Sequence, residues 1–156
     1  MIIIKGLFAG LLFLAAYSDA RRLLIPNILP LLLFALGCMA WFTGFPFAEP
    51  FWSHLLHFTI ALAIGMVLFH WGWFGGGDVK LYAALAFWFP MPSALLLLLA
   101  VALSGLIVVI FVMTIRLMGP IAGSSPSAKA GLMKRRIAYG VAIAIGGVFT
   151  MLWVYP

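Results

Sequence analysis

The sequence predicts an all-α membrane protein, a bundle of about six transmembrane helices that forms a single domain over residues 1–156. Of its residues, 67% are hydrophobic and 8% are charged, whereas a soluble domain is about 45–50% apolar and about 25% charged. Six spans of about 20 residues use about 120 residues, which leaves only short loops in a chain of 156. We therefore expect no separate soluble domain within this sequence.

Glycine, proline and charged residues separate the apolar segments and set their expected boundaries. The segments are expected at about residues 2–17, 28–43, 54–72, 79–89, 93–115 and 137–155. Between the first two, Pro26 ends helical geometry because it lacks an N–H and restricts Ile25 to extended backbone. Asn27 can then cap the helix that follows. The longest loop, residues 116–136, is rich in glycine, serine, proline and basic residues.

The positions of the basic residues predict how the bundle is oriented. Of the nine Lys and Arg residues, eight fall in the loops after the first, third and fifth segments, and Lys5 alone lies on the other side. Loops rich in Lys and Arg face the cytoplasm, so both termini are expected outside it, and Asp19 and Asp78 on its side. Because orientation accounts for the net charge of +6, the expected partner is the lipid bilayer and not a nucleic acid.

The segment at residues 79–89 is too short to cross a membrane as an ordinary helix. About 12 helical residues rise about 18 Å, against a hydrocarbon core of about 30 Å. The Gly75-Gly76-Gly77-Asp78 backbone before it is therefore expected at membrane depth. Irregular backbone is tolerated there only when it is buried in protein or lines a wet cavity. The sequence thus predicts a water-accessible pocket on the cytoplasmic side.

Residues that commonly bind metals are sparse. The chain has one cysteine, Cys38, which can form neither an internal disulfide nor a zinc site. His54 and His57 are three residues apart on a predicted helix and could share a metal. Because no acid or cysteine lies beside them in the sequence, we expect them at the membrane interface, and we expect no metal or cofactor.

Two of the three acidic residues, Asp19 and Asp78, fall at the cytoplasmic ends of predicted helices. A carboxylate at the edge of the hydrocarbon is costly and usually functional. Asp78 follows three glycines, which allow a tight turn and the close approach of another chain. Two carboxyl groups a few ångströms apart do not both ionise easily, so one keeps a proton while the other acts as a base. Such a pair can activate water against a peptide carbonyl.

The spacing alone leaves other uses of the same acids open. Each acid could instead form a structural ion pair, Asp19 with Arg21 or Arg22 and Asp78 with Lys80. A small transporter or channel subunit could use the acids as proton or cation sites. A scaffold of a secretion apparatus would need them only as structural pairs.

Three motifs resemble those of the type IV prepilin peptidases, a family of GxGD intramembrane aspartic proteases. The stretch Gly75-Gly76-Gly77-Asp78-Val79-Lys80-Leu81 resembles the GxGD motif and the residues that follow it. The stretch at residues 19–27 resembles the first aspartate of the family, with basic residues and then Ile-Pro-Asn after it. Residues 138–147 resemble its closing helix, although Ala138 stands where the family usually has proline. The resemblance, carried by these three motifs in order, extends over nearly the whole chain.

The resemblance implies an aspartic endopeptidase that removes the leader peptide of prepilins after a glycine, at the cytoplasmic face of the bacterial inner membrane. Within the family the chain looks like the short form of Tad/Flp pilus systems. The larger members carry a methyltransferase region with cysteine pairs, which this sequence lacks, so methylation of the product is not expected. The resemblance assigns catalysis to Asp19 and Asp78 and implies no cofactor.

Several other residues are expected to support this site. They are the motif residues Gly75, Gly76, Gly77, Lys80, Pro26 and Asn27. Arg21 and Arg22 could contact the substrate. For these two arginines, as for Lys80, the alternative is a role as membrane anchors on the cytoplasmic side.

Overall fold

Helices make up the regular structure of the chain in a computed structural model that describes residues 1–47, 49–118 and 138–156. Six are α-helices and one is a short 3-10 helix: α1 Ile2–Arg22, α2 Ile28–Phe42, α3 Phe51–His70, α4 Gly76–Ala86, η1 Met91–Ser93, α5 Ala94–Met118 and α7 Tyr139–Val154. The described residues contain no strand, so the predicted all-α class is confirmed. Most of the long loop expected at residues 116–136 lies outside the described residues.

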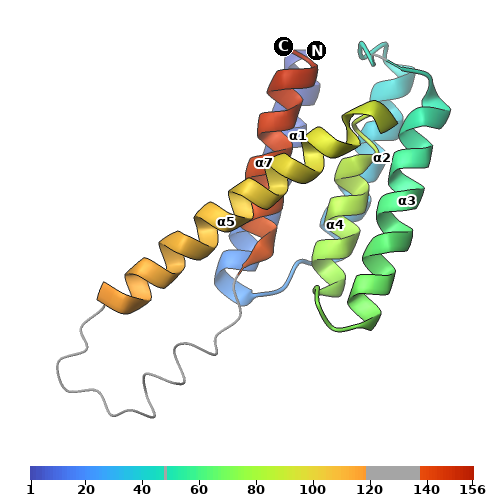
Figure 1. Ribbon diagram of the computed structural model, residues 1–156. Helices are drawn as coiled ribbons and strands as arrows, with labels where there is room; N and C mark the ends of the chain where they lie inside the picture. The colour runs from blue at the N-terminus through green and yellow to red at the C-terminus, as the bar shows by residue number, and fades with distance from the viewer. Residues whose placement is uncertain (48, 119–137) are drawn as a thin grey trace.

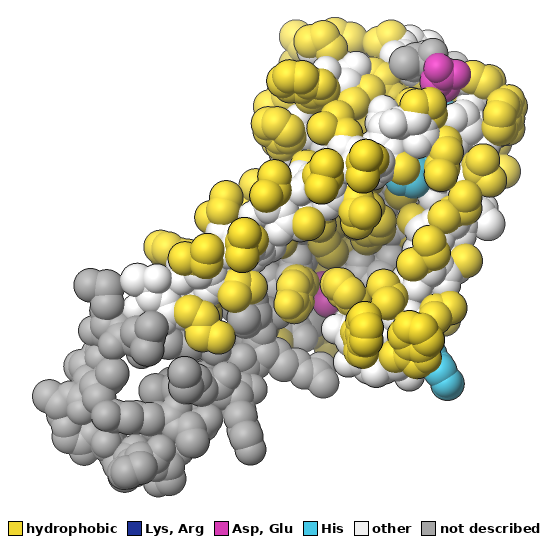
Figure 2. All heavy atoms as spheres, in the orientation of Figure 1, with side chains coloured by type: hydrophobic (Ala, Val, Ile, Leu, Met, Phe, Trp, Pro, Cys, Tyr) yellow, Lys and Arg dark blue, Asp and Glu magenta, His cyan; other side chains and the backbone are white. Residues whose placement is uncertain are grey.

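The helices are suited to a membrane by length and by surface. Within the described part of the chain, three stretches are long and apolar enough to cross one: Ile2–Arg22, Phe51–His70 and Met91–Ile115. Helices α2 and α7 are apolar but shorter, with 15 and 16 residues. Hydrophobic side chains cover most of the coloured part of the face seen in Figure 2. Large hydrophobic residues such as Phe42 and Trp153 are exposed on the surface of the protein. These features are those of an integral membrane protein.

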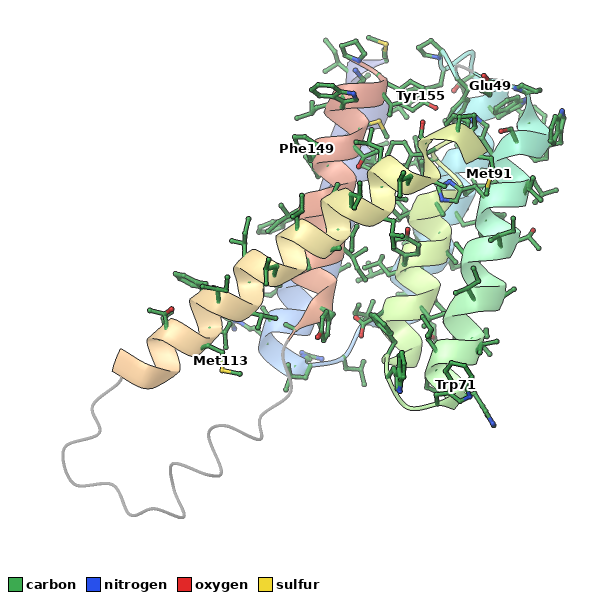
Figure 3. The ribbon with its side chains drawn as sticks, in the orientation of Figure 1. Glu49, Trp71, Met91, Met113, Phe149 and Tyr155 are labelled. Atoms are coloured by element: carbon green, nitrogen blue, oxygen red, sulfur yellow. The ribbon has the colours of Figure 1, made fainter. Side chains whose placement is uncertain are left out.

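The helices pack around α7 and α4. Helix α7 packs along both α1 and α5, and α4 packs against α3, α2 and α7. Gly146 permits the close packing of α7 on α5, since a Cβ there would lie 2.7 Å from the Cα of Val101. Both termini lie at one end of the bundle (Figure 1). Figure 3 shows Glu49 and Tyr155 at that end and Trp71 at the opposite end, where the chain turns from α3 into α4.

The end of α4 that lies near the termini is fixed by two histidines. His54 Nδ1 donates to the carbonyl oxygen of Phe87 at 3.0 Å, and His57 Nδ1 donates to that of Phe89 at 2.9 Å. These carbonyls follow the last turn of α4, where no further helical partner is available. Both histidines are buried, with 0% and 3% of their surface exposed. Their role in fixing the end of α4 was not predicted from the sequence, and a position at the depth of the membrane interface stays a prediction.

Several helix ends differ from the sequence-based boundaries by a few residues, and two of them bear on the aspartates. Helix α1 continues to Arg22 and ends at Leu23, which adopts a left-handed conformation with φ 52°. Helix α4 begins at Gly76, so two of the three motif glycines belong to the helix. As a result Asp19 lies in the last turns of α1, and Asp78 lies in the first turn of α4.

Candidate active site

Asp19 is held by the start of a helix that is distant in sequence. The backbone N–H of Gly140, in the first turn of α7, donates to Asp19 Oδ2 at 2.6 Å. N–H groups in the first turn of a helix have no partner within the helix, and the helix dipole favours negative charge there. Asp19 is 5% exposed. The contact therefore fixes both the position and the direction of this carboxylate.

Only glycine leaves room for this contact at position 140. A Cβ on Gly140 would lie 2.8 Å from Asp19 Oδ2 and 2.9 Å from Ile25 Cδ1. In the sequence, Gly140 falls within a motif but no role could be assigned to it. The contact could not be foreseen because it joins residues 121 positions apart. The motif at residues 138–147 was the only signal in the sequence that pointed to this position.

Asp78 is held by its own helix and by the glycines before it. A Cβ on Gly75 would lie 2.8 Å from Asp78 Oδ2, so the carboxylate folds back over that glycine. Gly76 and Gly77 are close to other elements, since their Cβ atoms would meet the ring of Phe69 at 3.3 Å and Ile25 Cβ at 3.1 Å. The three glycines thus allow the start of α4 to lie close to its neighbours.

The two aspartates line one hollow, at the end of the bundle opposite the termini. Its volume is about 860 Å³. The walls are formed by residues 23–27 after α1, by residues 72–77 before and at the start of α4, and by Tyr139 at the start of α7. Asp19 and Asp78 are near enough for their charges to interact. The hollow therefore brings together two carboxyl groups that are 59 positions apart in the sequence.

The ion pairs that the sequence left open as an alternative are not formed in the described part of the chain. Lys80 Nζ instead donates to Asn27 Oδ1 at 3.0 Å, which ties α4 to the loop after α1. The Arg21 guanidinium lies 4.8 Å from the centre of the Tyr17 ring. Asp19 accepts its hydrogen bond from a backbone N–H. The carboxyl groups in the hollow are thus free of the basic side chains expected beside them.

The other predicted site residues divide into two groups. Pro26, Asn27 and Lys80 line the hollow together with the three motif glycines. Arg21 and Arg22 are exposed at the end of α1 and do not line it. A contact between these arginines and a substrate stays a prediction. In the residues with described positions, no group of three or more His, Cys, Asp or Glu side chains lies close enough to hold a metal ion.

Comparison with known proteins identifies the family. No curated protein gave a significant match to the chain, and no solved structure did. The sequence model of the type IV leader peptidase family matches residues 6–110, about two-thirds of the 156 residues. The matched region contains Asp19, Asp78 and every residue of the glycine motif. With both carboxyl groups in one hollow and this match over most of its length, the chain belongs to the type IV leader peptidase family.

Proposed function

We propose that this protein is a single-domain aspartic endopeptidase that removes the leader peptide of Flp-like type IV prepilins. Membership of a peptidase family makes it a hydrolase. The observation that carries the finer proposal is the shared hollow, in which Asp19 and Asp78 approach from different helices without a basic partner. Two such carboxyl groups can divide the roles of acid and base between them.

The reaction follows from a pair of carboxyl groups that holds one proton. The ionised carboxylate takes a proton from a water molecule while the water oxygen attacks the carbonyl carbon of the scissile bond. The protonated carboxyl donates its proton to the carbonyl oxygen. When the C–N bond breaks, the first carboxyl gives its proton to the leaving nitrogen and the second recovers one from the intermediate. The pair then again holds a single proton and needs no cofactor.

The surroundings of the hollow suit a substrate that is polar on one side of the cleaved bond. Backbone and polar groups of residues 23–27, together with Lys80, can bind an extended leader peptide. The resemblance implies cleavage after a glycine, whose lack of a side chain would let the substrate backbone come close to both carboxyl groups.

The proposed location is the bacterial inner membrane, with the active site facing the cytoplasm. Arg21, Arg22 and Lys80 lie at the same end of the molecule as the hollow, as the rule for basic residues expects of a cytoplasmic end. The termini lie at the other end (Figure 1), which the proposal places outside the cytoplasm.

The test is co-expression with a full-length Flp-type prepilin, whose size is read on a gel. Wild type is expected to shorten the prepilin, and Asp19→Asn and Asp78→Asn are expected to leave it intact while accumulating in the membrane to the same level. A variant that still shortened the prepilin at the wild-type rate would exclude its aspartate from the chemistry. The transporter and scaffold interpretations would then regain weight.

A further inference from the structure

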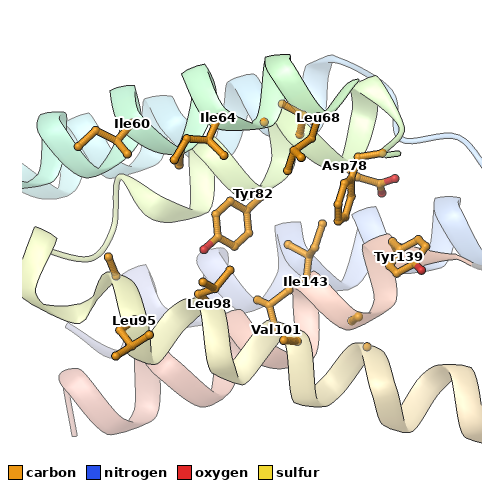
Figure 4. A pocket seen from close by; sticks show the side chains of 18 of the residues that line it. Ile60, Ile64, Leu68, Asp78, Tyr82, Leu95, Leu98, Val101, Tyr139 and Ile143 are labelled. Carbon is orange, nitrogen blue, oxygen red and sulfur yellow. The ribbon is translucent and has the colours of Figure 1, made fainter. Parts of the chain in front are cut away.

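A second hollow, of about 640 Å³, joins the first one beside Asp78. The two hollows share Phe74, Asp78 and Tyr139 in their walls. Figure 4 shows Ile60, Ile64 and Leu68 of α3 on one side and Leu95 and Leu98 of α5 on the other. We call this second hollow the apolar groove.

The apolar groove exists because α5 leans away from α3 and α4 (Figure 1). Helices α3 and α4 pack on each other, and α5 packs along α7, whereas η1 connects the two pairs at the end near the termini. Figure 1 shows α5 diverging from α4 toward the opposite end. Figure 2 shows this region as a depression among hydrophobic side chains, with an acidic side chain visible inside it.

Small residues line both sides of the apolar groove. Ala61 faces it from α3, and Ala102 and Gly105 face it from α5. Small residues at such positions let a further transmembrane helix approach closely. From His57 to Leu68 the groove follows 12 residues of α3, a rise of about 17 Å or three helical turns.

We propose that the apolar groove binds the transmembrane helix of the substrate, with the scissile bond at the polar end beside Asp78. This inference rests on the proposed function and names how that site selects its substrate. Within hydrocarbon a chain must satisfy its own backbone hydrogen bonds, so a segment in the apolar groove has to be helical. The substrate becomes extended only where it enters the first hollow, in which Asn27, Lys80 and loop backbone supply polar partners.

Site-directed crosslinking tests this assignment with a matched pair on α5. Leu98 lines the apolar groove and Leu99 does not, yet the two leucines are 54% and 51% exposed. Each is replaced by cysteine in a Cys38→Ala, Asp19→Asn background, and single cysteines are placed along the first three turns of the prepilin helix. Leu98→Cys is expected to form disulfides with prepilin positions that recur every three or four residues, and Leu99→Cys is not.

Kinetics give a second readout that separates helix binding from catalysis. Leu98→Trp is expected to raise KM for the full-length prepilin about tenfold, because an overfilled apolar site excludes the helix. Leu99→Trp is expected to leave KM unchanged. For a soluble peptide that contains the leader and the cleaved bond but lacks the helix, the two variants should give the same KM.

The outcomes distinguish this inference from the proposed function. Cleavage by wild type without a disulfide specific to Leu98→Cys would overturn the apolar groove as the helix site and leave the peptidase assignment standing. A disulfide specific to Leu98→Cys, together with no cleavage of prepilin by the wild type, would support helix binding and overturn the proposed activity. Disulfides between two copies of the Leu98→Cys protein, with none to prepilin, would show that the groove is an interface of the protein with itself.

Discussion

Asp19 and Asp78 line one hollow, but different parts of the molecule hold them. Asp78 lies in the first turn of α4 and folds back over Gly75, three residues earlier. Asp19 is held by Gly140, 121 residues later, and so depends on the packing of α7 along α1. One carboxyl group is thus positioned by local sequence and the other by tertiary structure. This difference predicts which substitutions elsewhere in the chain will displace each carboxyl group.

The strongest test asks whether the two aspartates act as a unit despite being held differently. Asp19→Asn and Asp78→Asn should each lower kcat by at least about a thousandfold, and the double variant should be no worse than either. Rates are measured on purified protein with a full-length prepilin. Losses that multiply in the double variant would mean that the two carboxyl groups act in separate steps.

Gly140→Ala should have the next largest effect, because the added Cβ displaces the Asp19 carboxylate from the start of α7. A displacement of about 1 Å in a catalytic group costs about a hundredfold in rate, and the loss should fall on kcat. Gly10→Ala is the matched control, since nothing lies within 4 Å of a Cβ at that position. Equal activity of the two variants would remove Gly140 from the positioning of Asp19.

Gly75→Ala should have a smaller effect, about tenfold on kcat. The added Cβ would meet only the Asp78 carboxylate, a side chain that can rotate away, and φ at Gly75 is −74°, which alanine adopts freely. Measured beside Gly140→Ala, this variant compares local with long-range positioning directly. A larger loss for Gly75→Ala would reverse the comparison.

The smallest effect is expected at the hydrogen bond between Lys80 and Asn27, which is exposed. The free energy of unfolding is measured for Asn27→Ala, Lys80→Met and the double variant, which complete a double-mutant cycle with the wild type. The coupling energy should be about 0.5–1 kcal/mol, and cleavage should change by only a few fold. A coupling near zero would mean that this bond does not help to hold α4 against the loop after α1.

The arrangement of helices could be predicted largely from the apolar segments, but some of the helix ends could not. Hydropathy falls after residue 17, so the first segment was expected to end there. The helix nevertheless runs on through Asp19, since Asp-Ala-Arg-Arg is compatible with helix. It ends at Leu23, whose left-handed backbone precedes the extended residues before Pro26.

The residue types of the candidate site could be predicted from the sequence, but several of its contacts could not. Acidic residues at the edge of apolar segments are costly and mark Asp19 and Asp78 in the sequence, and both line the hollow. The roles of Gly140, His54 and His57 were missed because their partners lie 32 to 121 residues away. The apolar groove was missed too, because it depends on the angle at which α5 leaves the bundle.

The two ends of α4 differ in how firmly they are attached, and this difference sets how the spacing of the carboxyl groups can change. Beyond its last turn, backbone carbonyls accept hydrogen bonds from His54, His57 and the hydroxyl of Tyr155. Before its first turn lie Gly72, with φ +75°, and Gly75, the first of the motif glycines. A small tilt of α4 would therefore pivot about the histidines and move Asp78 the most. Glycine torsions alone could absorb such a tilt, so catalytic alignment can be adjusted without unpacking the core.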